Sequence, residues 1–276
     1  MMIQTQAIVL QIRPWSQTSH MVTWLTPDYG KITTSVKGAV RPKSAFLGQY
    51  DLFYTCDLLF YKRERGGVHA IRECTPIRFR EALRHAWRQT AAAAYLVDLT
   101  AQATASHQET ADIFALLTQA LDTLTAGTCL PKNVILWYET HLLRLLGIKP
   151  DFTLCPLCHT PDQQQMRFSL ASGRFLCPHL AKRQAGEATL TLPRSVQTLF
   201  NKFSQLTTPP LQFKANAQTI TKKNRPDDHL LLGLSRFLGI FITFHIDVPS
   251  VVRRVTFEML DSNHTQQIAL PERCLL

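Results

Sequence analysis

The sequence predicts an α+β protein of more than one domain, with an N-terminal β-barrel and a C-terminal α-helical domain. Three observations predict it: five short strand-like runs at the start, a change to helical periodicity near Phe79, and a cysteine cluster that interrupts the helices. We expect the barrel at residues 1–78, the helical domain at 79–276, and a zinc-ribbon-like insertion at about 151–180. With 276 residues, 45% of them hydrophobic, the chain is long enough to bury such cores.

The first 75 residues alternate short runs of β-branched and aromatic residues with turns rich in Pro, Gly and Asp. The expected strands are Thr5–Ile12, His20–Leu25, Lys31–Val36, Asp51–Tyr61 and Val68–Cys74. Five short strands with one long loop favour a small closed barrel of the oligonucleotide-binding (OB) fold. An SH3-like barrel or an open sheet would give a similar pattern.

The next segments have apolar residues at helical spacing. The expected helices are 79–103, 109–124 with Gly127 as its stop, and 131–146 with Gly147 as its stop. Short links between them predict a bundle. A further short helix precedes residue 205. The last helix, within the segment 222–246, is expected to be capped by Asp227 or Asp228 and to lie in the core of the helical domain, since it is too short and too interrupted for a membrane span.

The positive charge of the chain, +10 with a pI near 9.5, is concentrated in two regions. Residues 1–80 carry 11 Lys and Arg against 5 Asp and Glu, residues 81–150 carry 5 against 6, and residues 151–276 carry 14 against 9. This distribution favours binding to a polyanion, although a basic surface can also serve solubility alone. The start of the chain has no secretory signal, so we expect a cytoplasmic protein without a membrane anchor.

Three of the seven cysteines form a pattern typical of a zinc site. Cys155 and Cys158 are separated by two residues, and Cys177 follows with His179 two positions later. We expect one structural zinc held by Cys155, Cys158, Cys177 and His179. The sequence leaves open His159 or water as the fourth ligand, and a metal-free loop with reduced thiols. The other cysteines lie among apolar neighbours and are expected to be buried: Cys56, Cys74, Cys129 and Cys274.

Between the two halves of this cluster the sequence predicts a two-stranded ribbon. Residues 166–177, MRFSLASGRFLC, are typical of two short strands that turn at Ser172-Gly173. Phe168 and Phe175 are then placed to pack on each other. The ribbon would carry the second cysteine group at its end.

Two glycine-flanked loops of the barrel region carry the candidate DNA-binding cations: Lys37, Arg41, Lys43, Arg63 and Arg65. Cations on barrel loops can follow a phosphate backbone. Nearby aromatic residues could offer faces for base stacking, or could form the barrel core: Tyr50, Phe53, Tyr54, Phe60 and Tyr61. For Phe53 and Phe60 we favour the core. Weaker candidates, at least as consistent with solvated surface, are Lys222, Lys223, Arg225, Arg253 and Arg254.

The sequence contains none of the common catalytic motifs, such as a phosphate-binding loop, a nucleophile elbow or a HExxH helix. His107-Gln-Glu109 ahead of Cys155-x-x-Cys158 is similar to the motif of zinc deaminases. Leu154 stands where that motif needs proline, and two predicted helical segments lie between the halves. We therefore expect a protein that is not an enzyme.

Three stretches together resemble the RecO family of bacterial recombination mediators. They are TQAIVL with WLTPDYGKITTSVKGAVRPKS, then YETHLLRLLGIKPDFTLCPLC, and lastly LLLGLSRFLGIFITFH with SVVRR. The resemblance covers nearly the whole chain in the same order. Two positions depart from the family pattern: Leu180 replaces the last cysteine of the second zinc pair, and Val40 replaces an arginine common in the loop that follows Lys37.

The resemblance implies an OB-fold barrel, a helical domain and, in many members, a zinc site. It also implies a role in DNA repair and recombination: binding of single- and double-stranded DNA, strand annealing, and action with RecR in the RecF pathway to load RecA onto DNA coated by the single-stranded-DNA-binding protein. The helical domain would receive the acidic C-terminal tail of that protein. The expected protein is a nucleoid-associated monomer. The alternative is a zinc-stabilised protein-interaction adaptor with no DNA activity of its own.

Overall fold

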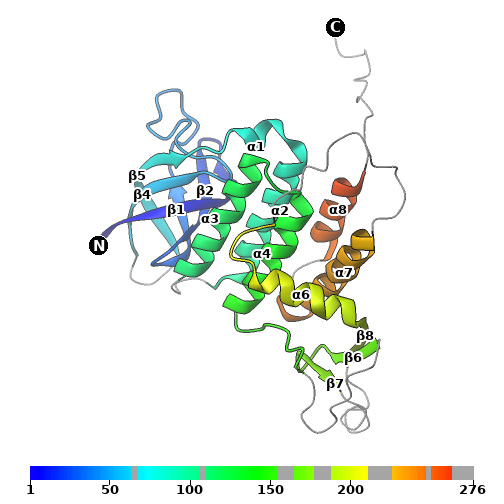
Figure 1. The fold of residues 1–276 in the computed structure, drawn as a ribbon. Coiled ribbons are helices and arrows are strands. Elements are labelled where there is room, and N and C mark those ends of the chain that lie inside the picture. The colour runs from blue at the N-terminus through cyan, green and yellow to red at the C-terminus, as the bar shows by residue number, and fades with distance from the viewer. Residues whose placement is uncertain are drawn as a thin grey trace.

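A computed structural model describes residues 1–63, 67–105, 110–153, 165–176, 188–210, 226–246 and 250–262. Figure 1 shows the barrel packed against one side of a group of helices, with a small sheet at the opposite end of the helical region. The barrel and the helical domain are the two parts expected from the sequence.

Five strands form the closed barrel: β1 (Met2–Ser16), β2 (Ser19–Thr26), β3 (Gly30–Val36), β4 (Thr55–Tyr61) and β5 (Val68–Arg78). Their order around the barrel is β1-β2-β3-β5-β4, with β3 and β5 parallel and the other paired strands antiparallel. This closed five-stranded arrangement confirms the OB-like barrel over an open sheet. Its interior is filled by alternate side chains of the strands, among them Val9, Trp24, Leu58 and Phe60.

Two strand boundaries differ from the expected ones. β1 continues through Pro14 to Ser16, because this end of the strand pairs with the start of β2. β4 begins at Thr55 rather than Asp51, because Phe53 has a φ of 71° and interrupts extended backbone. The interruption is fixed to β1, since the Val9 N–H donates to the Tyr54 carbonyl at 3.0 Å and the Phe53 N–H donates to the Val9 carbonyl at 3.4 Å.

The helices are α1 (Ala82–His85), α2 (Trp87–Ala103), α3 (Ala111–Ala126), α4 (Pro131–Leu145), α6 (Arg194–Gln205), α7 (Pro226–Ile246) and α8 (Ser250–Asp261). Their apolar faces share one core, which confirms the helical domain. Gly127 ends α3 with a φ of 63°, as expected for a left-handed C-terminal stop. The single helix expected over 79–103 is wrong, because Ala86 has φ −120° and ψ 81° and separates α1 from α2.

Helix α7 corrects the expected cap and confirms the expected packing in the helical core, along one side of the helix. It begins at Pro226, so Asp227 and Asp228 lie inside the helix rather than before it as caps. Only one of its sides is buried, since Ile240 and Phe244 remain exposed while Phe237 and Phe241 pack in the helical core. Among the described residues, α7 is the one helix long and apolar enough to cross a membrane, and 33% of that span is buried in this protein. Its packing is that of a helix at the edge of the core.

The barrel is fixed to the helices by apolar contacts and by buried polar groups. Ile8, Leu10 and Leu25 of the barrel belong to the core of the helical domain. Arg80 donates to Asp122 of α3 at 2.8 Å and to Thr55 at 3.0 Å. These contacts give the barrel a defined orientation against α2 and α3.

A small sheet lies at the far end of the helical domain. It contains β6 (Gln165–Ser169), β7 (Arg174–Leu176) and β8 (Thr189–Pro193) in the order β7-β6-β8. β6 and β7 form the expected hairpin, and Phe168 pairs with Phe175 with their ring centroids 5.8 Å apart. The third strand, β8, was not expected, because residues 189–193 come after the second cysteine group and give no separate ribbon signal.

Candidate nucleic-acid interface

The long loop after β3 is tied to the neighbouring β1–β2 turn. The Gly38 N–H donates to Ser19 Oγ at 3.3 Å, and the Val40 N–H donates to the Thr18 carbonyl at 3.3 Å. Gly38 has a φ of 66°, a conformation that side-chain-bearing residues rarely adopt. Ala39 is buried in the barrel core and anchors the start of the loop. The loop is therefore a supported surface feature with a defined path.

Three of the candidate cations lie on this loop. Lys37, Arg41 and Lys43 are exposed, and none of them has an ion-pair partner within the described part of the chain. The Arg41 side chain runs over Gly38, where an added Cβ would lie 3.2 Å from the Arg41 Cδ. The glycine thus supplies both the turn and the space in which Arg41 rests. Unpaired cations on a supported loop can contact phosphates without first breaking an internal salt bridge.

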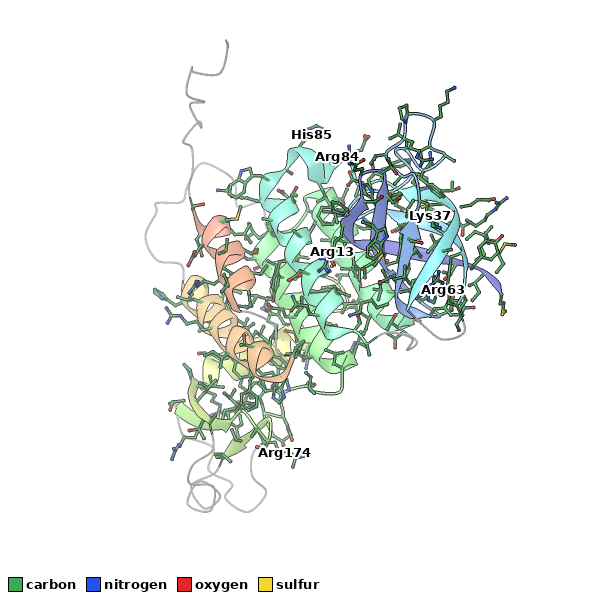
Figure 2. The ribbon with its side chains drawn as sticks, turned by 180° about the vertical axis from the view of Figure 1, so that it is seen from behind. Arg13, Lys37, Arg63, Arg84, His85 and Arg174 are labelled. Carbon is green, nitrogen blue, oxygen red and sulfur yellow. The ribbon has the colours of Figure 1, made fainter. Side chains whose placement is uncertain are left out.

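The second basic turn lies at a different end of the barrel. Ser35 of β3 pairs with Ala70 of β5, which in turn pairs with Tyr61 of β4, so the three residues form one row across the sheet. Lys37 follows Ser35 by two residues, and Arg63 follows Tyr61 by two residues. Because β3 and β4 run in opposite directions, the two cations lie on opposite sides of this row. At about 3.3 Å per residue, the two cations are separated by roughly 13 Å along the strands. Figure 2 shows Lys37 and Arg63 at separate places on the barrel. Arg63 is exposed, and Arg65 falls outside the described residues.

Most of the aromatic residues considered for stacking are part of the core. Tyr50 and Tyr54 are buried, which excludes them as open stacking faces in this conformation. Tyr50 makes a 2.8 Å hydrogen bond with His20, and burial, with a smaller contribution from Cys74, raises the pKa of Tyr50 to about 12. Phe60 is fully buried, as expected. Tyr61 is exposed.

The remaining aromatic candidate and the described ones among the weaker basic candidates lie in different environments, some partly buried and some exposed. Phe53 is partly buried against the helical core. Arg253 does not fit a DNA contact, because its guanidinium is engaged inside the protein, where it makes a bidentate pair with the buried Glu139 at 2.6 and 2.9 Å. Arg254 is exposed and lies 3.9 Å from Glu258. The remaining candidates fall outside the described residues: Lys222, Lys223 and Arg225.

Arg13 and Arg72 are exposed cations of the barrel that were not singled out from the sequence. Arg13 was assigned to a turn because Pro14 follows it, yet β1 continues past both residues. Arg72 lies on β5, two residues after Ala70, and its contact with Glu73 is long at 3.7 Å. The parallel pairing of β3 with β5 places Arg72 toward the Lys37 end of the barrel. The alternation of β5 would have identified Arg72 as outward-facing.

All four expected zinc ligands lie outside the described residues: Cys155, Cys158, Cys177 and His179. Within the described ranges there is no group of three or more His, Cys, Asp or Glu side chains arranged to hold a metal. The described cysteines Cys56, Cys74 and Cys129 are buried, as expected, and Cys274 lies outside the described residues.

Comparison with known proteins gives a consistent match over both parts of the chain. Residues 1–80 match the family model for the recombination protein O N terminal, and residues 84–251 match that for the recombination protein O C terminal. The chain is 28% identical over 177 residues to a DNA repair protein RecO of Alkaliphilus metalliredigens, covering 64% of this chain and 71% of that protein. It is 27% identical over 198 residues to a DNA repair protein RecO of Syntrophus aciditrophicus, covering 71% and 75%.

A DNA repair protein RecO of Bacillus mycoides is likewise 27% identical over 196 residues, covering 69% of this chain and 77% of that protein. The two family models together account for the barrel, which carries the basic loop, and for most of the helical domain. The chain therefore belongs to the recombination protein O (RecO) family of DNA repair proteins.

Proposed function

We propose that the protein is a DNA-binding recombination mediator in the cytoplasm, associated with the nucleoid, and not itself an enzyme. It binds single- and double-stranded DNA, anneals complementary strands and acts with RecR to load RecA onto DNA coated by the single-stranded-DNA-binding protein. One observation carries the proposal: an OB-like barrel displays exposed cations without ion-pair partners, among the described residues, on a supported loop. Such cations neutralise phosphates and release counterions, which makes binding steeply dependent on salt.

The test is a salt titration of single-strand binding with two matched variants. The first variant replaces with Ala the loop cations Lys37, Arg41, Lys43, Arg63 and Arg65. The control variant removes the same charge from exposed cations of the helical domain: Lys149, Arg167, Arg174, Lys202 and Arg236.

The loop variant should bind single-stranded DNA more weakly and with a shallower salt slope, by about one unit for each lost phosphate contact. Annealing of complementary strands should fall with it. The control variant should stay close to the parent, because its charges lie on other parts of the molecule. Equal loss in both variants would mean a diffuse charge effect, and parental binding by the folded loop variant would contradict the barrel as the DNA site.

The helical domain contains a pocket with apolar lining, one cation, Arg144, and one carboxylate, Asp112. It has a volume of about 400 Å³ and lies where α3, α4 and the end of α6 meet. Leu116, Trp137 and Leu145 supply apolar lining, and Arg144 and His141 supply polar groups at the same pocket. We infer that this pocket receives the C-terminal tail of the single-stranded-DNA-binding protein, with Arg144 pairing with its terminal carboxylate.

Calorimetric titration with a synthetic tail peptide tests this assignment. Arg144→Ala should weaken binding of the intact tail, whereas Arg236→Ala, on the exposed side of α7, should leave it unchanged. A tail peptide lacking its last residues should bind neither the parent nor the two variants. Equal heats from intact and truncated peptides would remove the pocket from the proposal.

We also propose one structural zinc held by Cys155, Cys158, Cys177 and His179. Its support is the spacing of the ligands and the β6–β7 hairpin, which lies between Cys158 and Cys177 in the chain. Elemental analysis of protein purified without added metal should find about one zinc per chain. Cys155→Ala should reduce stability more than it reduces DNA affinity per folded molecule, because the metal would hold a ribbon and contact no phosphate.

A further inference from the structure

Trp15 is an aromatic side chain in an unusual position. It is 68% exposed, more than any other aromatic residue in the described ranges. It lies near the end of β1, immediately before the tight turn into β2. An indole ring combines a large apolar face with a polar N–H, so a tryptophan exposed at a hairpin end offers a face on which a ligand ring can stack.

The backbone at Trp15 is irregular in a way that turns the side chain outward. Pro14 is paired with His20 and Ser16 with Ser19, so Trp15 is the extra residue of a β-bulge. Bulges reorient side chains, and they are common beside functional sites. Pro14 supplies no N–H to the strand pairing, which suits it to this irregular end of β1.

The bulge lies beside the basic loop. His20 is paired with Pro14 on one side and with Val36 on the other. Trp15 follows Pro14, and Lys37 follows Val36. Because β1 and β3 are both antiparallel to β2, they run in the same direction, so Trp15 and Lys37 lie at the same end of the sheet. Two strand spacings of about 4.8 Å place their backbones roughly 10 Å apart. The hydrogen bonds from Gly38 and Val40 to the β1–β2 turn fix this arrangement.

We propose that Trp15 is a stacking site for a nucleobase of single-stranded nucleic acid whose phosphates are held by Lys37 and Arg41. The proposal deepens the proposed function and rests on it. An indole face accepts any base, whereas the cations accept the charge of any phosphate, so the site is selective for unpaired strands and indifferent to sequence. In a duplex the bases are stacked on one another and their faces are closed to Trp15.

The variants that test the site are Trp15→Ala, which removes the ring, and Trp15→Phe, which keeps an aromatic face. Trp87→Ala is the matched control, because Trp87 is 46% exposed at the start of α2 in the helical domain. The exposed position of Trp15 means that its replacement leaves the barrel core intact, which a thermal melt checks. The probes are fluorescein-labelled oligodeoxythymidylate, the same strand with abasic positions, and a duplex of equal length.

Trp15→Ala should bind oligodeoxythymidylate at least about fivefold more weakly than the parent, with an unchanged salt slope, because a stack and not a phosphate contact is lost. Trp15→Phe should recover most of the affinity. On the abasic strand and on the duplex, Trp15→Ala and the parent should bind alike. Lys37→Ala should instead lower the salt slope on every probe.

Fluorescence supplies a second readout. In a Trp87→Phe background, Trp15 is the exposed tryptophan of the protein, since Trp24 and Trp137 are buried. Oligodeoxythymidylate should quench the solvent-exposed emission and protect it from acrylamide, and the abasic strand should do neither. Parental affinity of Trp15→Ala for oligodeoxythymidylate would overturn the stacking site while leaving DNA binding intact. Failure of the parent to bind any probe with a steep salt dependence would overturn the proposed function itself.

Discussion

Glu139 is fully buried on α4, and its carboxylate is bound by two side chains from other helices. Arg253 of α8 pairs with it through both oxygens, and the Tyr95 hydroxyl of α2 donates to it at 2.6 Å. Burial acts to lower the pKa of Arg253, but the Glu139 carboxylate more than offsets it and raises that pKa. The sequence could not identify this pair, because the partners are 114 residues apart and Arg253 looks like an ordinary surface cation.

Removing one charge of this pair should therefore be costly. Glu139→Gln should lower the free energy of unfolding by about 3–5 kcal/mol, because it leaves the Arg253 charge in the interior without a counter-ion. Replacing both residues with Met should recover much of the loss. Glu258→Gln, which disrupts the exposed pair with Arg254, should cost less than about 0.5 kcal/mol. Urea unfolding measures all three, and a Glu139→Gln protein as stable as the parent would contradict a buried charge pair.

Tyr50 should contribute to instability at high pH. Its pKa is raised to about 12 in the folded protein, against about 10 in an unfolded chain. The unfolded state loses the proton first, so stability is intact below pH 10 and falls as the pH rises toward 12. Tyr50→Phe should flatten this part of the stability profile, and Tyr61→Phe, at an exposed phenol, is the control. Urea unfolding at several pH values between about 10 and 12 measures the effect. The same decrease in the free energy of unfolding with pH in the parent, Tyr50→Phe and Tyr61→Phe would exclude it.

At the scale of elements, the sequence predicted strands and helices well where one periodicity continued unbroken. The bounds of α3 and α4 lie within two residues of the expected ones, because Gly127 follows the last residue of α3 and Pro131 is the first residue of α4. The expected bounds were wrong where strand pairing or one backbone conformation overrides local propensity. The break at Ala86 and the long β1 are two such cases. Local propensity alone favours a continuous helix through an alanine-rich segment.

Helix α8 is held against α7 at a close approach that only glycine permits. A Cβ at Gly239 of α7 would lie 2.7 Å from Nη1 of Arg253, and Arg253 cannot move away without losing Glu139. Gly239→Ala should therefore destabilise the protein by about 1–3 kcal/mol, although alanine is the better helix former. Ile240→Ala on the exposed side of α7 is the control. Urea unfolding that found Gly239→Ala more stable than the parent would mean that α8 is free to shift.

At the scale of the whole molecule, the pattern of residues predicted the two main parts and their classes but not how they join. The barrel strands and the helical stripes are local signals. The junction depends on Arg80, which has a φ of 51° and a side chain that is 2% exposed. Its guanidinium reaches the Phe53 carbonyl and Thr55 of the barrel and Asp122 of α3. The Trp15 bulge was equally hidden, because it depends on the pairing of β1 with β2.

Arg80 should couple the unfolding of the barrel to that of the helices. Burial lowers the pKa of Arg80 against the opposing effect of Asp122, and the guanidinium is held by donating to Asp122 of α3 at 2.8 Å. Arg80→Met keeps the apolar stem but leaves the Phe53 carbonyl and the Thr55 hydroxyl without this donor. Hydrogen bonds to charged groups contribute about 1.5–3 kcal/mol each, so a loss of a few kcal/mol is expected. Arg78→Met, which removes the more exposed partner of Asp122, is the matched control.

Two probes report the coupling in that experiment. Trp24 lies in the barrel core, so its fluorescence in a variant with the other tryptophans replaced by Phe follows the barrel, whereas circular dichroism at helical wavelengths follows the helical domain. In this background the two urea transitions should coincide when Arg80 is present, as expected for cooperative unfolding. With Arg80→Met the barrel transition should move to lower urea ahead of the helices, and with Arg78→Met the transitions should remain together. If the fluorescence and circular-dichroism transitions of the Arg80→Met protein coincide at the same urea concentration as when Arg80 is present, the apolar contacts of Ile8, Leu10 and Leu25 are sufficient to join the barrel to the helices.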